Sequence, residues 1–382
     1  MTMPTKYDVF AEVIERSPCK PKDLPFKVPV YNHLRSLIDI GWIQESHGVY
    51  IPIRNNNTIP AFNIIKYCLK NGLNHNVFFS RNALGIIIEL FRSAPFLRPD
   101  VVKGNKDSLE FIRYLEENQF ILVAQKRPVK GIILQHKIFD YLASLNGKKI
   151  SFKTSNYLDL RDTAIRLKES INPFDDSIFS YLSGSAGLEG STVTPGETRE
   201  LILKDIYPEK PQKDIQMIKN LNEALRYVFE HLHEEITEDH IKNLNGRVMF
   251  SFHRYAGNYK KTQNKIQGNP EFKTTAPNDV PTCMKSYVEF LNTIDSREKG
   301  LANIGKVHND IQRIHPFPDG TSRTTRMLVN WVMLRFDFPL LVIKMGCFDE
   351  YMSLSKLAQK RNDIRLTQLL QHLLVHESLL KH

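Results

Sequence analysis

The first 57 residues alternate apolar and polar positions in a pattern that predicts two helices and a hairpin. Apolar residues spaced three and four apart predict a helix from Tyr7 to Ile14, and a second is predicted from Val30 to Ile40, before a glycine. Two short strands, Trp42–Gln44 and Val49–Ile53, would pair as a hairpin. This order predicts a winged-helix domain at residues 1–57, whose second helix faces the DNA major groove with its polar start: Tyr31, Asn32, His33 and Arg35.

Residues 58–150 repeat much of this pattern and are predicted to form a second winged-helix-like domain. Three helices are expected, at Ser80–Phe91, near Pro99–Val102 and at Ser108–Glu117, followed by strands Phe120–Ala124 and Gly131–Leu134. The tip between the strands is basic and suits phosphate contact, with Lys126, Arg127 and Lys130. The third helix carries glutamates that would repel phosphates, so dimerisation or spacing is the alternative role.

From Asp159 onward strand signals fade and helical periodicity dominates, so residues 159–382 are predicted to form one mainly α-helical domain. A buried helix face runs from Leu301 to Ile314 and ends at His315, because a proline follows. A new helix is predicted from Thr321 to Leu334, and two amphipathic helices after Asp349.

Composition excludes several classes of protein. The chain has 382 residues, of which 41% are hydrophobic and 25% charged, which fits two or three folded domains and excludes disordered and collagen-like chains. Its four cysteines are far apart, and no run reaches the roughly 18–20 apolar residues of a membrane span. The first residues show no export signal, so we expect a cytoplasmic protein that does not bind membranes.

Positive charge is concentrated in the N-terminal part of the chain. Residues 1–150 hold 21 Lys and Arg against 13 Asp and Glu, whereas residues 151–382 hold 31 against 29. A basic unit attached to a nearly neutral one is typical of a nucleic-acid-binding module. The alternative is that the basic charge only keeps the protein soluble.

Candidate chemistry gathers around residues 315–326. A glycine-bearing loop that leads into a helix offers unpaired N–H groups and a positive dipole end to a phosphate. Arg323 and Arg326 lie on one face of the first turns, where they oppose the dipole, so an anionic ligand explains them better than stability does. Asp319 is an oxygen donor suited to Mg²⁺, and His315 is able to accept a proton from an attacking hydroxyl.

The segment HPFPDGTSRTTR, at residues 315–326, closely resembles the Fic family signature H-x-F-x-[D/E]-G-N-G-R-x-x-R. The resemblance implies a Fic-type helical bundle with a β-hairpin flap, and an enzyme that moves AMP from ATP to a Ser, Thr or Tyr hydroxyl of a target protein. It implies that His315 is the general base and Asp319 the Mg²⁺ ligand. It also implies a phosphate site made by Gly320, Thr321, Ser322, Arg323 and Arg326.

Two positions depart from the signature, because Thr321 and Ser322 replace Asn and Gly. Serine adopts positive φ less readily than glycine, although both hydroxyls are able to donate hydrogen bonds to an anion. Because of this departure, the sequence does not decide how fast the transfer is or which group is transferred from the nucleotide. Relatives place a residue that lines the adenine pocket near Tyr351, for which a core tyrosine is the alternative.

Residues 257–268, GNYKKTQNKIQG, resemble the flap of the family. Alternation between terminal glycines predicts a hairpin over the site, whose edge would hold a target segment by main-chain pairing. The residues expected to dock that segment are Tyr259, Thr262 and Ile266. An ordinary basic loop is the alternative.

Residues 185–190, SAGLEG, fit the inhibitory pattern [S/T]-x-x-x-E-[G/N] of the family, within a helix expected near residues 175–190. Ser185 and Glu189 are four positions apart and so share a helix face, and Gly190 completes the pattern. The resemblance implies that Glu189 pairs with Arg326 and keeps the γ-phosphate out; in some members this glutamate also positions water for removal of AMP. Gly184 and Gly187 weaken a helix by about 1 kcal/mol each, which predicts reversible fraying.

The expected function is therefore an autoinhibited protein adenylyltransferase with ATP and Mg²⁺ as ligands. Its partner would be a hydroxyl-bearing target protein, the chain itself included, with DNA or a second copy of the chain bound at residues 1–150. The alternative function is a DNA-binding transcriptional regulator whose degenerate Fic domain senses nucleotide without efficient turnover.

Overall fold

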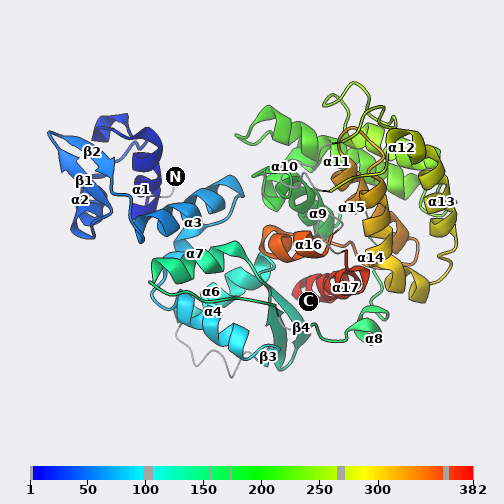
Figure 1. The fold of residues 1–382 in the computed structure, drawn as a ribbon, viewed down its shortest axis with the longest axis horizontal. Helices are drawn as coiled ribbons and strands as arrows, with labels where there is room; N and C mark the ends of the chain where they lie inside the picture. Colours follow the sequence, from blue (N-terminus) through cyan, green and yellow to red (C-terminus); the bar gives the residue numbers. More distant parts are fainter. Residues whose placement is uncertain are drawn as a thin grey trace.

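The computed structural model describes residues 3–97, 106–154, 156–169, 171–172, 174–264, 272–355 and 361–381. The described chain is mainly helical, with a few short antiparallel strands near its N-terminal end, as the periodicity predicted. Figure 1 shows the first unit projecting from one side, linked by α3 (Thr58–Lys70) to the rest of the molecule. Among the described residues no helix is both long enough and apolar enough to cross a bilayer.

The first unit contains the predicted helices and hairpin. Helix α1 spans Lys6–Arg16, α2 spans Tyr31–Asp39, and strands β1 (Ile43–Ser46) and β2 (Val49–Pro52) pair antiparallel. A capping box, in which the side chains of Thr5 and Asp8 bond each other's backbone N–H groups, begins α1. The apolar faces of both helices close on a core of their own, and on the outer side of α2 three of its polar residues are exposed: Tyr31, Asn32 and Arg35.

The second unit pairs helices with a three-stranded sheet in the order β3-β5-β4. Its elements are η2 (His75–Phe79), α4 (Ala83–Arg92), β3 (Phe96–Leu97), α6 (Lys106–Glu117), β4 (Ile121–Lys126), β5 (Val129–Ile133) and α7 (Lys137–Leu145). The predicted helix near Pro99–Val102 lies outside the described residues. Neither α3 nor α7 was predicted from the sequence, and the two helices pack against each other.

The remaining described elements are all helical. They are α8 (Arg161–Ala164), α9 (Asp176–Gly187), α10 (Pro195–Lys204), α11 (Gln212–Glu230), α12 (Glu238–Val248), α13 (Val280–Asn292), α14 (Arg297–Ile314), α15 (Thr321–Leu334), α16 (Phe348–Leu354) and α17 (Asp363–Lys381). The described residues also contain three short 3₁₀ turns. They are η1 (Pro21–Asp23) in the first unit, η3 (Pro277–Asp279) and η4 (Met345–Cys347).

Helices α14 and α15 lie at the centre of the largest hydrophobic core. Helix α14 packs against both α15 and α17, and α12 packs against α15, so the loop between α14 and α15 is held from several sides. The same core includes Leu122 and Ile132 from the sheet of the second unit, and Leu134 directly after β5. Helix α17 contacts β4 directly, so the sheet and the helical bundle share buried surface.

Candidate functional site

The loop at residues 315–320 joins α14 to α15 through two residues in the left-handed region. His315 has φ 49° and ends α14, where its N–H donates to the Ile311 carbonyl at 2.8 Å. Gly320 has φ 76° and begins α15. Between them Phe317 is fully buried, which anchors the loop in the core. The predicted boundaries at Pro316 and Thr321 are thus confirmed by the helices themselves.

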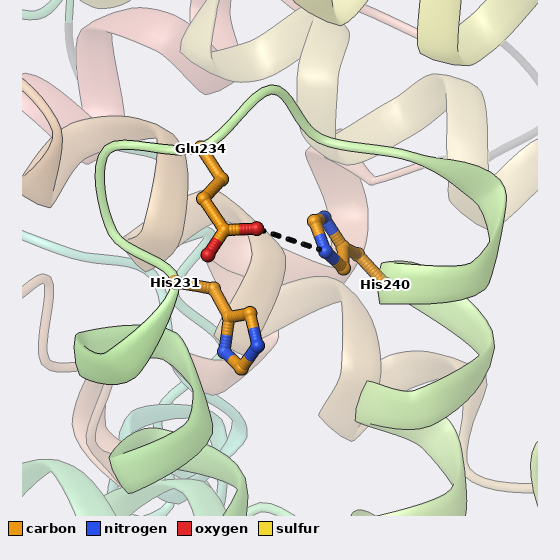
Figure 2. Close-up of side chains that lie close together, drawn as sticks. All are labelled: His231, Glu234 and His240. Atoms are coloured by element: carbon orange, nitrogen blue, oxygen red, sulfur yellow. Dashed lines mark ion pairs between the residues drawn. The ribbon is translucent and has the colours of Figure 1, made fainter.

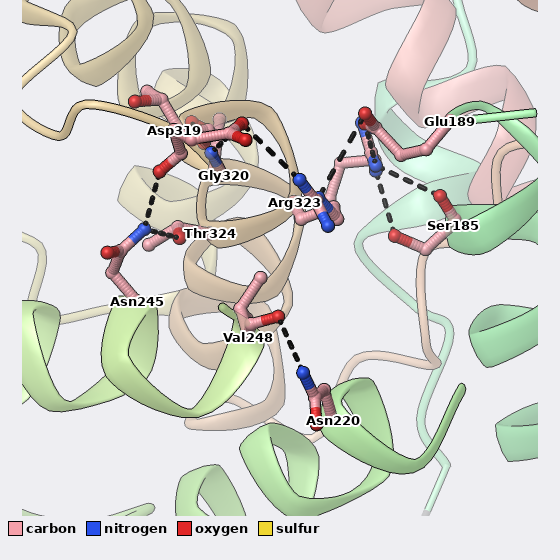
Figure 3. Close-up of polar contacts among 12 residues, drawn as sticks. Ser185, Glu189, Asn220, Asn245, Val248, Asp319, Gly320, Arg323 and Thr324 are labelled. Carbon is pink, nitrogen blue, oxygen red and sulfur yellow. Dashed lines mark hydrogen bonds and ion pairs between the residues drawn. The ribbon is translucent and has the colours of Figure 1, made fainter. Parts of the chain in front are cut away.

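Glycine is required at position 320 for two separate reasons. Its positive φ is costly for residues with a Cβ, and a Cβ there would lie 2.4 Å from Cγ and 2.5 Å from Sδ of Met249. Beside it, Asn245 of α12 donates from Nδ2 to the Asp319 carbonyl and to Thr324 Oγ1, each at 3.1 Å (Figure 3). Asn245 Oδ1 also accepts from the Gly257 N–H at 2.9 Å. One buried amide therefore ties the loop to the segment that leads into residues 257–268.

Sequence reasoning missed Asn245. It lies some seventy residues before the loop, on an ordinary amphipathic helix, and an asparagine at a buried helix position has no signature of its own. Only the packing of α12 against α15 brings the amide to the loop.

Both arginines of α15 are buried in the structure. Arg326 donates from Nε to Ser185 Oγ at 2.9 Å, and from Nη2 to the Ser185 carbonyl at 3.0 Å and Glu189 Oε1 at 2.8 Å. Arg323 lies between two carboxylates, with Nη2 3.4 Å from Asp319 Oδ1 and Nε 4.0 Å from Glu189 Oε2 (Figure 3). The structure thus brings the predicted inhibitory segment onto the predicted phosphate-binding arginines.

The ion pair between Glu189 and Arg326 shifts the pKa of both groups. Burial alone raises the pKa of the Glu189 carboxyl, but Arg326 and then Arg323 outweigh burial and bring it below its ordinary value. Burial alone lowers the pKa of the Arg326 guanidinium, and the Glu189 carboxylate reverses this and raises it. Both groups therefore stay charged at neutral pH.

The inhibitory segment ends its helix earlier than predicted. Helix α9 stops at Gly187, and Glu189 lies in the following turn, which closes at Gly190 with φ 93°. A Cβ at Gly184 would lie 2.9 Å from the Ile343 carbonyl oxygen, whereas one at Gly187 would meet nothing within 4 Å. Gly184 therefore has a packing role, and only Gly187 has no neighbour that requires its small size.

Two polar atoms at the start of α15 are buried without a hydrogen-bond partner among the described residues. They are Thr321 Oγ1 and Arg323 Nε. Unpaired buried donors are costly unless a ligand completes them. Together with the N–H groups of the first turn, they make the start of α15 suited to an anion. Ser322 is half-buried at the same turn.

Asp319 fits the donor set of a magnesium ion that is shared with phosphates. Its side chain is 59% exposed, and its Oδ1 accepts from the Gly320 N–H at 2.5 Å and faces Arg323. One exposed carboxylate beside an anion site matches the habit of Mg²⁺, which takes one or two carboxylates and completes its shell with waters and phosphates.

The first half of the predicted flap lies against the loop. The Lys260 N–H donates to the Pro316 carbonyl at 2.8 Å, and Asn264 Nδ2 donates to the carbonyls of Phe317 and Pro318. Tyr259 donates to Glu238 at 2.8 Å, and Thr262 is exposed. Residues 257–264 contain no strand, and Ile266 lies outside the described residues, so the hairpin stays a prediction.

Lys260 is a second residue that sequence reasoning passed over. Its side chain is 3% exposed, and Nζ donates to Thr274 Oγ1 at 2.8 Å and to the Ile314 carbonyl at 3.4 Å. Burial lowers the pKa of this amine to about 8. A lysine inside a basic segment gives no sign of being buried, because burial depends on where the segment packs.

Tyr351 of α16 is buried, and its hydroxyl lies 2.5 Å from His308 Nε2 of α14. Burial raises the pKa of its phenol to about 12, and the nearby Arg326 guanidinium opposes this shift. Tyr351 thus lies close to the arginine side of the site. Its predicted contact with an adenine ring stays a prediction.

The chain is similar in sequence to a known protein family and to several known proteins. The family model described as Fic/DOC family matches residues 235–333, which contain both Asn245 and the loop but not the segment at 185–190. The chain is 28% identical over 207 residues to protein adenylyltransferase fic-1 of Caenorhabditis elegans, covering 50% of this chain and 39% of that protein. It is 29% identical over 202 residues to protein adenylyltransferase Fic of Nematostella vectensis, covering 51% and 46%. The chain thus spans less than half the length of these relatives.

Two solved structures align with parts of this chain. A Fic domain containing signaling protein from Bacteroides thetaiotaomicron aligns with a TM-score of 0.49 and 23% identity, covering 58% of this chain and 92% of that one. Fic-1 from C. elegans aligns with a TM-score of 0.46 and 21% identity, covering 86% and 88%.

Proposed function

Since residues 235–333 form a Fic/DOC family domain, we propose that the protein is a protein adenylyltransferase, which moves AMP from ATP to a hydroxyl of a target protein. The observation that carries the proposal is the buried pair of arginines, Arg323 and Arg326, directly after the loop that holds His315. Unpaired polar atoms at Thr321 and Arg323 support an anionic ligand there. The curated relatives in this comparison are themselves named protein adenylyltransferases.

In the proposed reaction His315 accepts the proton of a Ser, Thr or Tyr hydroxyl. The hydroxyl oxygen attacks the α-phosphorus of ATP, the bond to the β-phosphate oxygen breaks, and pyrophosphate leaves. The N–H groups of residues 321–323, with the hydroxyls of Thr321 and Ser322, hold the phosphates, and Arg323 offsets their charge. A Mg²⁺ ion bound at Asp319 would supply further charge neutralisation.

We further propose that Glu189 holds the enzyme in a low-activity state. Its carboxylate takes up the Arg326 donors that a γ-phosphate would otherwise use, as the 2.8 Å contact supports. Productive seating of ATP then requires the turn at residues 188–190 to release Arg326. Gly187 and Gly190 flank the glutamate in this turn, and glycines make the backbone easier to unwind. Local unwinding therefore releases Arg326 at a low cost in free energy.

The experiment that tests the function asks which phosphate of ATP is transferred to protein. Glu189→Gly protein is incubated with ATP that carries the label on the α-phosphate or, in parallel, on the γ-phosphate. Label on protein from α-labelled ATP alone supports adenylyl transfer. Label from γ-labelled ATP would indicate kinase-like transfer, and binding without covalent label would indicate a nucleotide sensor.

The first unit favours a second function that does not compete with the first. The outer face of α2 exposes Tyr31, Asn32 and Arg35, and the adjoining residues 58–150 hold 14 Lys and Arg against 7 Asp and Glu. We propose that this face contacts DNA. DNA retention that weakens steeply with salt, and weakens further in Arg35→Glu, would support it; a change of mass in solution without DNA retention would support dimerisation instead.

A further inference from the structure

A group of metal-binding side chains lies at the connection between α11 and α12, away from the arginine site. His231 caps the end of α11, Glu234 lies on the connecting loop, and His240 lies in the first turn of α12. One ligand atom from each residue lies within 4.8 Å of the others. Figure 2 shows the carboxylate and the two imidazoles gathered in the space between the helix ends.

We propose that His231, Glu234 and His240 bind a divalent transition-metal ion of the zinc class. Two imidazoles and one carboxylate are a donor set that suits Zn²⁺, Co²⁺, Ni²⁺ or Cu²⁺, whereas Mg²⁺ and Ca²⁺ prefer oxygen ligands alone. Three protein ligands leave the fourth position of a tetrahedral ion for water.

The hydrogen bonds around His231 already orient it as a ligand. Its Nδ1 lies 2.9 Å from the Tyr227 carbonyl, which can only accept, so Nδ1 carries the proton and Nε2 keeps its lone pair. A ligating histidine usually donates its other ring N–H to such an acceptor, which fixes the tautomer and the ring. The Tyr227 ring beside it, 4.1 Å between centroids, restricts the ring further.

Glu234 and His240 lie close enough to close on an ion with small movements. Glu234 Oε2 is 3.5 Å from His240 Nε2, about the spacing of two ligands on one tetrahedral metal. Glu234 is exposed and free to adjust, whereas the His240 side chain is only 16% exposed. Binding at Nε2 would move the His240 ring proton to Nδ1, at the cost of the long 3.4 Å contact from the Thr237 N–H.

The local charge also favours a cation. Residues 231–240, HLHEEITEDH, contain four carboxylates and no lysine or arginine. A bound ion would link the end of α11 to the start of α12, the helix that carries Asn245. The site would therefore stabilise the scaffold behind the loop and is independent of phosphate binding.

The chain supplies its own optical reporter for the site. The Trp331 ring lies 5.5 Å from the His240 ring, and the other tryptophan, Trp42, lies in the core of the first unit. In a Trp42→Phe background, Cu²⁺ or Co²⁺ bound at the site should quench Trp331 emission.

The test titrates the full chain with Zn²⁺ by calorimetry at pH 7.5, and with Co²⁺ by visible absorption and Trp331 emission. We expect one site that loses affinity by about tenfold or more in His231→Gln and in His240→Gln, with Glu234→Gln affected less because its ligand is exposed. His233→Gln and Glu235→Gln, which alter exposed neighbours outside the group, should bind like the unchanged protein. Affinity should also fall as the pH is lowered, because an imidazole nitrogen binds a metal ion only in its deprotonated form.

Two results would overturn the proposal. One is the absence of saturable binding and of Trp331 quenching in folded protein at Zn²⁺ or Co²⁺ concentrations up to a millimolar. The other is binding that His231→Gln and His240→Gln leave unchanged, which would assign the ion to other residues. Far-ultraviolet circular dichroism confirms in each case that the variant is folded.

Discussion

Glu189 Oε1 accepts a hydrogen bond from Arg326 Nη2 at 2.8 Å, although 137 residues separate the two positions in the chain. The carboxylate comes from a turn after α9, and the guanidinium from the second turn of α15. Arg326 is 5% exposed and donates twice more to Ser185, so three of its five N–H groups are directed to one short segment. Under the proposed function, an anion that binds Arg326 Nη2 would compete with Glu189 for that donor.

Replacing Glu189 with glycine should raise ATP-dependent labelling of protein by about tenfold or more, the effect of removing a competing hydrogen bond of about 1.4 kcal/mol. The measurement is the initial rate of label incorporation from α-labelled ATP. Glu209→Gly, in the exposed loop after α10, is the matched control and should leave the rate unchanged. Flat labelling in folded Glu189→Gly protein would contradict the inhibitory role.

His315→Ala, made in the Glu189→Gly background, should lower labelling by about 10²- to 10⁴-fold, because a general base contributes on that scale. Nucleotide affinity, measured by calorimetry, should change little. The exposed His233→Ala serves as control. If His315→Ala retained the full rate, the base would have to be a different group.

Gly320→Ala should destabilise the protein by about 2–4 kcal/mol. An alanine at positive φ costs about 1–2 kcal/mol, and the clash of its Cβ with Met249 adds a similar amount. Thermal unfolding measures the loss. In a double-mutant cycle with Met249→Ala, which leaves a cavity of its own, the part that comes from the clash should appear as a favourable coupling, and Gly187→Ala, which has open space around its Cβ, should be neutral or stabilising. Equal melting temperatures for Gly320→Ala and Gly187→Ala would refute the packing argument.

Asn245→Ala removes three hydrogen bonds, to Asp319 of the loop, to Thr324 of α15 and to Gly257, and should lower the free energy of unfolding by about 2–3 kcal/mol. Because the loop loses its fixed position, the rate of labelling should fall more than nucleotide affinity does. Asn245→Asp keeps the acceptor for Gly257 but places a buried carboxylate oxygen against the Asp319 carbonyl oxygen, so it should destabilise the protein at least as much as Asn245→Ala does. Asn243→Ala, exposed on the same helix, is the control. A loss of stability without any change in rate would show that Asn245 is purely structural.

Lys260 should make stability depend on pH above neutrality. Burial lowers its pKa to about 8 in the folded protein, from 10.5 in the unfolded chain, so the unfolded state binds more protons between these values. The free energy of unfolding contributed by this group therefore rises with pH, by about 3 kcal/mol between pH 8 and pH 10.5. Urea unfolding of Lys260→Met should lack this rise, whereas the exposed Lys261→Met should show it in full. If the free energy of unfolding rose equally with pH in Lys260→Met and Lys261→Met, the lowered pKa of Lys260 would be contradicted.

The sequence predicted those parts of the fold that depend on local periodicity or on punctuation by proline and glycine. The break at Pro316 and the restart at Thr321 fix the loop, and the alternation around residues 42–53 fixes the first hairpin. The pairing of Glu189 with Arg326 followed from the family resemblance, not from periodicity. Asn245 and Lys260 could not be found, because an amide or amine gains its role only from the distant backbone that it meets. Helix α3 was not predicted, because it begins after a run of asparagines that suggests a loop.

Gly346 makes the junction between the second unit and the helical bundle intolerant of any added atom. A Cβ at this position would lie 2.3 Å from the Asn118 carbonyl oxygen and 2.4 Å from the Phe120 nitrogen, and the Gly346 N–H donates to that carbonyl at 2.9 Å. The neighbouring Gln119 side chain bonds Val342 and Lys344 on the same stretch. In a chimera that joins this bundle to a foreign N-terminal segment, the backbone around Gly346 would therefore lose the close contact and the hydrogen bonds that residues 118–120 provide. If the second unit were exchanged during evolution, residues 118–120 and residues 342–346 would therefore have to change together.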